Sequence, residues 1–207
     1  KIKYLRYNQF MFYIFGLGNP GKEYEKTKHN AGRIALFEIA KKNKFSDWEE
    51  SKKASASISS GIISDKKVTF VLPNTFMNNS GLSAKYFIKS AKDRDKFLVA
   101  YDDLDIPIGK IKMSKNRSSG GHNGVESIIK NLKSENFGRI RIGISKEKKK
   151  GGVIRPDGSK LRDVLVEKNF SASEMIEFKK SIKKVSEAIE IFIEKDFDSA
   201  MNKANTN

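Results

Sequence analysis

Apolar stretches of strand length recur along this chain and are separated by polar turns. Residues 11–18 and 97–101 are apolar at consecutive positions, which is typical of strands covered on both faces of a sheet. Residues 138–144 alternate instead, with an isoleucine at every second position from Ile140. On this pattern we predict strands over residues 11–18, 54–63, 67–72, 97–101, 110–113 and 138–144.

Apolar residues at helical spacing fill most of the intervals between these strands. The periodicity predicts helices over residues 30–42, 82–91 and 125–132. In the first of these we expect Ile34, Phe37 and Ala40 to face the core. Ser171 and Glu174 have the spacing of a capping box, which indicates a further helix near the C-terminus. Its packing face is formed by Ile182, Val185, Ile189 and Phe192.

Strands that alternate with helices are typical of a single α/β domain. At 207 residues the chain is long enough for one well-buried core and too short for two independent domains. We therefore predict a three-layer α/β/α sandwich with a mixed, mostly parallel central sheet. Residues 1–10 are interpreted as a polar extension and residues 11–207 as the single domain. Within it, residues 146–169 are charged and glycine-rich and are interpreted as a mobile surface loop.

The chain is strongly basic, because 41 lysine and arginine residues against 25 aspartate and glutamate residues give a formal net charge of +16. This charge favours a polyanionic partner, with nucleic acid as the leading class. The alternative is a lysine-rich solvated surface that binds nothing. The chain contains no cysteine, which excludes disulfides and thiolate metal sites and fits a reducing compartment such as the cytoplasm.

An apolar run near the N-terminus has some features of a signal peptide. Lys1, Lys3 and Arg6 precede the apolar residues 10–15. The run continues directly into the glycine-rich residues 16–21 without a small-residue cleavage site, and no apolar stretch in the chain is long enough to cross a bilayer. We therefore expect neither a signal peptide nor a membrane anchor.

The only two histidines stand in loops of asparagine and glycine. His29 begins the sequence His-Asn-Ala-Gly, and His122 lies within Gly-Gly-His-Asn-Gly. Imidazole has an unperturbed pKa near neutrality, so two histidines beside amides and flexible glycines favour a catalytic role. We expect the two loops to converge on one site.

Residues 16–21 also match the dinucleotide-binding pattern G-x-G-x-x-G. That site requires a helix to start at once, whereas Pro20 lacks an N–H and residues 22–28 have no helical periodicity. The acid expected about twenty positions later is Glu38, which falls inside a predicted helix. We expect no dinucleotide and no other cofactor.

Five segments occur in the order found in a known enzyme family. They are Gly-Leu-Gly-Asn-Pro-Gly with His-Asn-Ala-Gly within 16–32, Pro-Asn-Thr-Phe-Met-Asn-Asn-Ser-Gly at 73–81, Asp-Asp-Leu-Asp at 102–105, Gly-Gly-His-Asn-Gly at 120–124 and Arg-Ile-Arg-Ile-Gly-Ile at 139–144. With this set, the chain resembles bacterial peptidyl-tRNA hydrolases from about Phe12 to Asn202, the insertion at 146–160 excepted. The resemblance implies a phosphorylase/hydrolase-like fold. It also implies hydrolysis of the ester between a peptide and the 3′ ribose of tRNA, which recycles tRNA from abandoned translation.

The residue types suit that reaction. A neutral imidazole that takes a proton from water can hydrolyse an ester without a metal or a covalent nucleophile, and we assign His29 as this general base. Asp102 would accept the imidazole N–H and stabilise the imidazolium. By similarity, Asn19 positions the water and the base, while Asn78 and Asn123 bind the 3′ end and the peptide. For any one asparagine, a turn-forming role is the alternative.

Further residues are expected to contact the substrate. Tyr24 and Met77 are expected to line the cleft, with packing in the core as the alternative. His122 is expected to be a structural or binding residue rather than a second base. The predicted tRNA contacts are Tyr24, Met77, Asn78, Lys112, Lys115, Gly120, His122, Asn123 and Arg141, with Arg139 beside Arg141 on one strand face.

One position departs from the family pattern. The family typically has a basic residue where this chain has Ser114. This departure affects one contact to a terminal phosphate, for which Lys115 or Arg117 is the expected substitute.

Two groups of residues could suggest a metal site, the aspartates at 102–105 and the two histidines. Asp102, Asp103 and Asp105 lack the ligand spacing of an EF-hand, and the hydrolysis needs no cation, so we expect Asp105 to cap the turn before Pro107. A zinc site formed by the two histidines lacks a close-spaced ligand pair. We therefore expect no metal.

Two other functions remain open on the sequence. A serine hydrolase is disfavoured because Ser80, Ser118 and Ser119 lie outside any nucleophile-elbow sequence. A catalytically inactive RNA-binding protein of the same fold is the second possibility, but binding alone would not require His29 with a carboxylate partner. We expect a cytoplasmic, monomeric enzyme whose partner is peptidyl-tRNA.

Overall fold

Strand β1 (Phe12–Gly16) lies in the middle of the sheet, as expected for a segment that is apolar on both faces. It pairs in parallel with β4 (Lys66–Pro73) on one side and with β5 (Phe97–Pro107) on the other. Strand β7 (Gly138–Glu147) continues the parallel order beside β5. The carboxyl ends of these central strands therefore lie along one edge of the sheet.

The outer strands complete a mixed sheet. Strands β3 (Ala56–Ile63) and β6 (Ile111–Ser114) run antiparallel to their neighbours, and β2 (Glu49–Ser51) lies beyond β3. The order is β2-β3-β4-β1-β5-β7-β6, and β8 (Val153–Ile154) pairs with the end of β7. The computed structural model describes residues 11–155 and 168–206, and within them the predicted mixed, mostly parallel sheet is confirmed.

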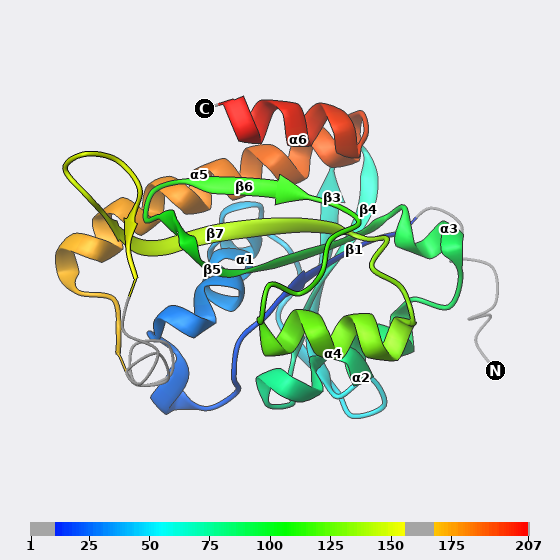
Figure 1. The fold of residues 1–207 in the computed structure, drawn as a ribbon. Helices are drawn as coiled ribbons and strands as arrows, with labels where there is room; N and C mark the ends of the chain where they lie inside the picture. Colours follow the sequence, from blue (N-terminus) through cyan, green and yellow to red (C-terminus); the bar gives the residue numbers. More distant parts are fainter. Residues whose placement is uncertain (1–10, 156–167, 207) are drawn as a thin grey trace, which may run out of the picture.

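Helices cover both faces of the sheet, so the predicted three-layer sandwich is also confirmed (Figure 1). One face carries α1 (Ala31–Lys42), α5 (Ala172–Glu194) and α6 (Phe197–Thr206). The other carries α2 (Ser80–Phe87) and α4 (Asn123–Leu132). A short helix α3 (Ala91–Arg94) precedes β5, and single turns η1 (Lys22–Tyr24), η2 (Lys28–Asn30) and η3 (Met77–Asn79) lie in the loops.

The prediction for the inner face of α1 is partly wrong. Ala40 is buried and Ile34 is partly buried against the core, but the Phe37 side chain is 49% exposed. Leu36 and Ile39 face the sheet instead. Phe37 stacks on Trp48 with a centroid distance of 6.0 Å and an interplanar angle of 8°, so a surface aromatic pair takes the place of the expected core contact.

The prediction for the C-terminal helix is confirmed. Ser171 and Glu174 form a capping box at the start of α5, in which the Ser171 hydroxyl accepts from the Glu174 N–H. Val185, Ile189 and Phe192 are buried on its packing face. Ile182 is partly buried against the same cluster.

Several boundaries differ from the prediction. Helix α2 ends at Phe87 rather than residue 91, and β5 continues through Asp102 to Pro107 after an irregularity in its pairing with β7. The first part of the expected 146–169 loop is a hairpin between β7 and β8. The predictions for residues 1–10 and for 156–167 lie outside the described residues. Among the described helices, none combines the length and apolar character needed to span a membrane.

Candidate active site

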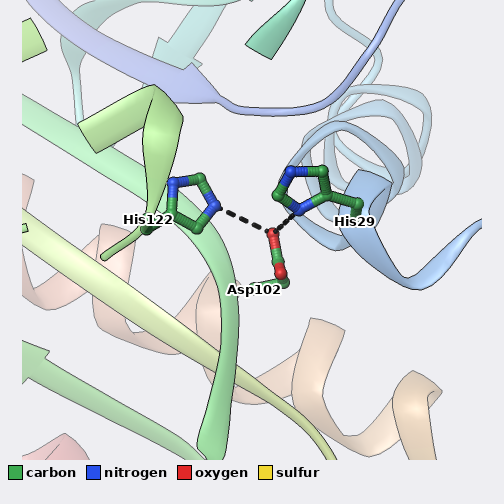
Figure 2. A group of neighbouring side chains, drawn as sticks. All are labelled: His29, Asp102 and His122. Atoms are coloured by element: carbon green, nitrogen blue, oxygen red, sulfur yellow. Dashed lines mark hydrogen bonds and ion pairs between the residues drawn. The ribbon is translucent and has the colours of Figure 1, made fainter. Parts of the chain in front are cut away.

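The two histidine loops meet at the carboxyl ends of β1 and β5. His29 lies in η2, immediately before α1, and His122 is the residue that caps the start of α4. Asp102 reaches the same place from β5 (Figure 2). Gly32 allows this approach, because a Cβ atom on it would lie 2.2 Å from the Ala100 carbonyl oxygen. The expected convergence of the loops is therefore observed.

His29 and Asp102 form a buried pair. The Nδ1 atom of His29 lies 2.9 Å from Oδ1 of Asp102, and the two residues are 7% and 4% exposed. Because an ionised carboxylate only accepts hydrogen bonds, Nδ1 carries the proton in this contact. The Nε2 atom of a neutral His29 is then left with a lone pair and can accept a proton.

His122 approaches the same carboxylate oxygen with its other nitrogen. Its Nε2 atom lies 3.0 Å from Oδ1 of Asp102. Its Nδ1 atom accepts hydrogen bonds from the backbone N–H groups of Gly124 and Val125, at 3.2 and 3.3 Å, and so caps α4. Both nitrogens of His122 are therefore engaged, and the proton of the neutral ring lies on Nε2.

These contacts shift the pKa values of the pair in opposite directions. Burial by itself would raise the pKa of Asp102, but the two imidazoles outweigh it and hold that pKa well below its usual range. Burial would lower the pKa of His29, but the charge and hydrogen bond of Asp102 outweigh it and raise that pKa. The carboxylate thus stabilises a protonated His29.

The same three side chains are a possible metal site. Their ligand atoms lie within 4.8 Å of one another, so the expectation that the histidines lack a close pair is wrong: the fold brings together residues distant in sequence. A metal bound through His29 Nδ1 and His122 Nε2 would need lone pairs on these atoms, which instead face the Asp102 carboxylate as hydrogen-bond donors in the tautomers assigned above. Moving the His122 proton to Nδ1 would also oppose the two N–H groups of α4. The hydrogen-bond pattern therefore favours proton transfer over coordination.

Asn19 is held in place by hydrogen bonds to two neighbours, Asn30 and Met77. Asn30 accepts from the Asn19 N–H at 2.8 Å and donates to its carbonyl at 2.9 Å. The side-chain oxygen of Asn19 accepts from the Met77 N–H at 2.9 Å. Since Oδ1 is engaged in this way, the amide orientation is fixed and its NH₂ group remains a donor.

The predicted substrate residues occupy different environments. Asn78 is exposed within η3, Asn123 is exposed as the first residue of α4, and Tyr24 is half-buried in η1. Gly120 is exposed with φ +60°, a conformation that favours glycine. Met77 is only 4% exposed and packs in the core, so its link to the site is the backbone contact to Asn19.

The predicted basic contacts separate into two places. Lys112 and Arg141 are in register on β6 and β7, and Arg141 Nε lies 2.7 Å from Asp103 Oδ2. Lys115 lies 3.7 Å from Asp95, near the amino end of β5. Strand β5 advances five residues from Phe97 to Asp102, which is roughly 17 Å. Lys115 therefore lies far from the Asp102 end of the strand.

Two expectations about charged residues are wrong. Arg139 does not project toward solvent beside Arg141, because it is 1% exposed and its guanidinium reaches the segments before and after α4. Its Nη1 donates to the Ser118 carbonyl at 2.7 Å. The turn before Pro107 is closed by Asp103, whose Oδ1 accepts from the Asp105 N–H at 2.7 Å, while the Asp105 carboxylate pairs with Arg155.

The His29 loop is attached to the start of α5. Lys28, which is 8% exposed, pairs with Glu174 at 2.7 Å, and its N–H donates to the Lys168 carbonyl at 3.2 Å. Thr27 forms a β-bridge with Asn169. His29 is thereby positioned by a helix that is distant in sequence.

Sequence reasoning missed three residues that this geometry brings forward. Asn30 orients Asn19, Lys28 anchors the His29 loop, and Phe76 is 59% exposed next to Met77. A large aromatic residue in the asparagine-rich 74–79 segment was the available signal for Phe76. The other two contacts join separate loops and left no sequence signal.

Comparison with known proteins gives a consistent result. The family model described as peptidyl-tRNA hydrolase matches residues 13–207. The chain is 42% identical over 194 residues to the peptidyl-tRNA hydrolase of Mycoplasma capricolum and 39% identical over 193 residues to that of Bacillus cytotoxicus. Both matches cover 93% of this chain and 98% of the relative.

A solved structure has the same fold. The crystal structure of peptidyl-tRNA hydrolase from Acinetobacter baumannii superposes with a TM-score of 0.82 at 29% identity, covering 94% of each chain. The resemblance inferred from the five sequence segments is therefore confirmed at the level of sequence and of structure.

Proposed function

This chain belongs to the peptidyl-tRNA hydrolase family and hydrolyses peptidyl-tRNA, and we propose that the attacking water is activated by the imidazole of His29. The observation that carries this mechanism is the buried contact between His29 Nδ1 and Asp102 Oδ1. It directs the proton of the neutral ring to Nδ1 and leaves Nε2 as the acceptor.

The reaction then proceeds in two proton transfers. Water adds its oxygen to the ester carbonyl carbon while His29 Nε2 takes one of its protons, and Asp102 stabilises the resulting imidazolium. The tetrahedral intermediate collapses by breaking the bond to the 3′ ribose oxygen, which receives the proton from His29. The products are a peptide with a free carboxyl group and tRNA with a free 3′ terminus, and the base is regenerated.

Asn19 is proposed to position the water and the base. Its side-chain oxygen is bound to the Met77 N–H, so its NH₂ group is available to a water or substrate oxygen. The Asn30 side chain hydrogen-bonds to both the N–H and the carbonyl of Asn19. The Asn19 donor is therefore preorganised before substrate binds.

The substrate is proposed to lie across the loops around this group. Asn78, Asn123 and Gly120 bind the 3′ end and the peptide, together with Tyr24 and the segment at Met77. His122, whose two ring nitrogens are engaged, supports this binding by holding the start of α4. Lys112 and Arg141 bind phosphates near the ester, and Lys115 binds one farther along the acceptor stem. The exposed ring of Phe76 is a stacking surface for a terminal base.

The remaining features of the proposal concern metal, assembly and location. We propose a metal-independent reaction, and the hydrogen bonds of both histidines to the Asp102 carboxylate support it. All proposed catalytic residues come from one chain, so a monomer suffices. A substrate used in translation fits the cytoplasm. No feature of the site favours the inactive RNA-binding alternative, since the pair of His29 and Asp102 is fully formed.

A rapid-quench experiment tests the proposed mechanism. The enzyme is treated with excess chelator, the tRNA fold is held constant with a polyamine, and peptidyl-tRNA is added. Hydrolysis at the untreated rate, with no peptide attached to the protein at any time, is expected. A peptidyl-enzyme adduct, or activity that returns only with one divalent ion, would contradict water activation by His29 alone.

A further inference from the structure

Arg139 is a fully buried arginine within the part of the chain that the structure describes. It is 1% exposed, although a guanidinium stays charged at neutral pH. Burial lowers its pKa, and the neighbouring Tyr101 acts against this change. A buried charge is costly unless hydrogen bonds compensate it. Nη1 and Nη2 of Arg139 have such partners while its Nε has none among the described residues, so the partners of the two terminal nitrogens indicate what the side chain holds in place.

The partners of Arg139 are backbone carbonyls on both sides of α4. Its Nη1 donates to Ser118 at 2.7 Å, in the segment that leads into the helix. Its Nη2 donates to Glu135 at 3.4 Å, in the segment that follows the helix. The guanidinium also lies over the Phe137 ring, 4.6 Å from its centroid. One side chain on β7 therefore connects the sheet to both ends of the α4 segment.

The first of these contacts fixes a turn that has little packing of its own. Gly120 and Gly121 have φ values of +60° and +83°, and a Cβ atom on either would meet nothing within 4 Å. The turn is closed internally, by the His122 N–H donating to the Ser119 carbonyl at 3.1 Å. The hydrogen bond from Arg139 to Ser118 ties this turn to the sheet.

A second path leads from Arg139 to the proposed catalytic group. Tyr101 neighbours Arg139 closely enough to oppose the lowering of the Arg139 pKa by burial. The Tyr101 ring packs edge-on against His122, with centroids 4.7 Å apart and an interplanar angle of 62°. His122 in turn donates to Asp102 (Figure 2).

We propose that Arg139 is a positioning residue for peptidyl-tRNA hydrolysis, which holds the Ser118 carbonyl and thereby sets the places of His122 and Asn123 at the start of α4. This inference rests on the proposed function. Arg139 does not touch the ester. It acts through the turn, so its loss displaces the residues beyond the turn and leaves His29 in its loop.

The test compares Arg139→Lys and Arg139→Met with wild type at a temperature well below the Tm of each protein. Lysine keeps the charge but has no planar fork with which to serve two carbonyls, and methionine keeps only the apolar stem. Because displacements near 1 Å cost up to about 100-fold in rate, we expect kcat to fall roughly tenfold or more in Arg139→Met, with KM raised. Arg139→Lys should have kcat and KM values between those of Arg139→Met and wild type.

A control variant separates positioning from general stability. Ile189→Ala opens a cavity in α5, on the opposite face of the sheet, and lowers the Tm without contact to the turn. It should keep wild-type kcat, KM and pH profile. In Arg139→Met the acidic limb of the pH–rate profile should move, since the His122 contact to Asp102 is weakened, and hydrogen exchange at the Gly121 and His122 amides should accelerate.

Two results would overturn the proposal. One is wild-type kcat, KM and pH profile in both Arg139 variants, whatever their Tm. The other is unchanged exchange at the turn while activity falls. If Arg139→Met does not fold, Arg139→Lys decides the question by the same readouts. Failure of the proposed function is distinguishable, because wild type would then not hydrolyse peptidyl-tRNA or His29→Ala would keep full activity.

Discussion

The imidazole rings of His29 and His122 lie with centroids 5.1 Å apart and present different nitrogen atoms to one carboxylate oxygen. His29 uses Nδ1 and keeps Nε2 for a proton. His122 uses Nε2, and its Nδ1 is bound to the start of α4. The two rings are therefore not interchangeable as bases, and their substitution should have different effects.

Substitution of the base tests this asymmetry directly. His29→Ala should lower the single-turnover rate of peptidyl-tRNA hydrolysis by roughly two to four powers of ten, the usual contribution of general-base catalysis. Its affinity for tRNA should change little, because the phosphate contacts lie elsewhere. Rates and binding are measured in parallel on one peptidyl-tRNA. Normal turnover by His29→Ala would place the base in another loop.

The pH dependence follows from the raised pKa of His29. Only the neutral ring accepts a proton, so activity should be lost as pH falls through a pKa above the ordinary histidine value. In Asp102→Asn the carboxylate charge is removed and burial alone remains, so the acidic limb should move to lower pH. The plateau rate should fall at the same time, because the imidazolium is less stabilised. A limb that stays in place or moves upward contradicts this assignment.

His122→Ala should have a smaller effect on rate than His29→Ala and an opposite effect on the pH profile from Asp102→Asn. Removing one donor leaves more of the Asp102 charge for His29, which raises the pKa of His29 further and moves the acidic limb to higher pH. Loss of the cap on α4 should lower stability by about 1 kcal/mol. Denaturant unfolding and a pH–rate series measure the two effects. Abolished chemistry at all pH values would show that His122 does more than hold Asp102.

Phosphate binding predicts a steep salt dependence. Arg141→Ala should weaken tRNA binding and reduce the slope of log affinity against log salt concentration by about one. Lys112→Ala, which removes its cross-strand neighbour, should act in the same direction. Lys41→Ala removes an equal charge from the far end of α1 and serves as the control. Equal slopes in all three variants would contradict specific phosphate binding by Lys112 and Arg141 and would indicate a general effect of net charge.

Hydrophobic periodicity predicted the layers of the fold but not the direction of every side chain. The strands and the α5 packing face follow from spacing alone, since one period allows one buried face. Phe37 does not follow, because its ring finds a partner in Trp48, which lies outside the periodic segment. Arg139 does not follow either: alternation puts it on the face of Arg141, and only the position of α4 decides that one is buried and the other is not.

In the site, too, the sequence predicted some residues, whereas other contacts depend on how distant segments pack. His29, Asp102 and Asn19 were identified by residue type and by segments shared with a family. The fold brings His29 into contact with Asp102 and bonds Asn19 to Asn30, the residue after His29. The close approach of His122 to Asp102 could not be predicted, because it depends on where α4 docks against β5. The separation of Lys115 from Arg141 is likewise a matter of strand direction, since β6 runs antiparallel to β7.

The attachment of the His29 loop to α5 has a consequence for how the molecule opens. Lys28 and Glu174 are 146 positions apart, and the backbone contacts of Thr27 with Asn169 and of Lys26 with Phe170 reinforce their link. The two segments therefore belong to one cooperative unit, with a common opening free energy in native-state hydrogen exchange. Fraying at the first turn of α5 would release the His29 loop while the sheet remains intact, so we expect the enzyme to lose activity on heating before it loses its fold.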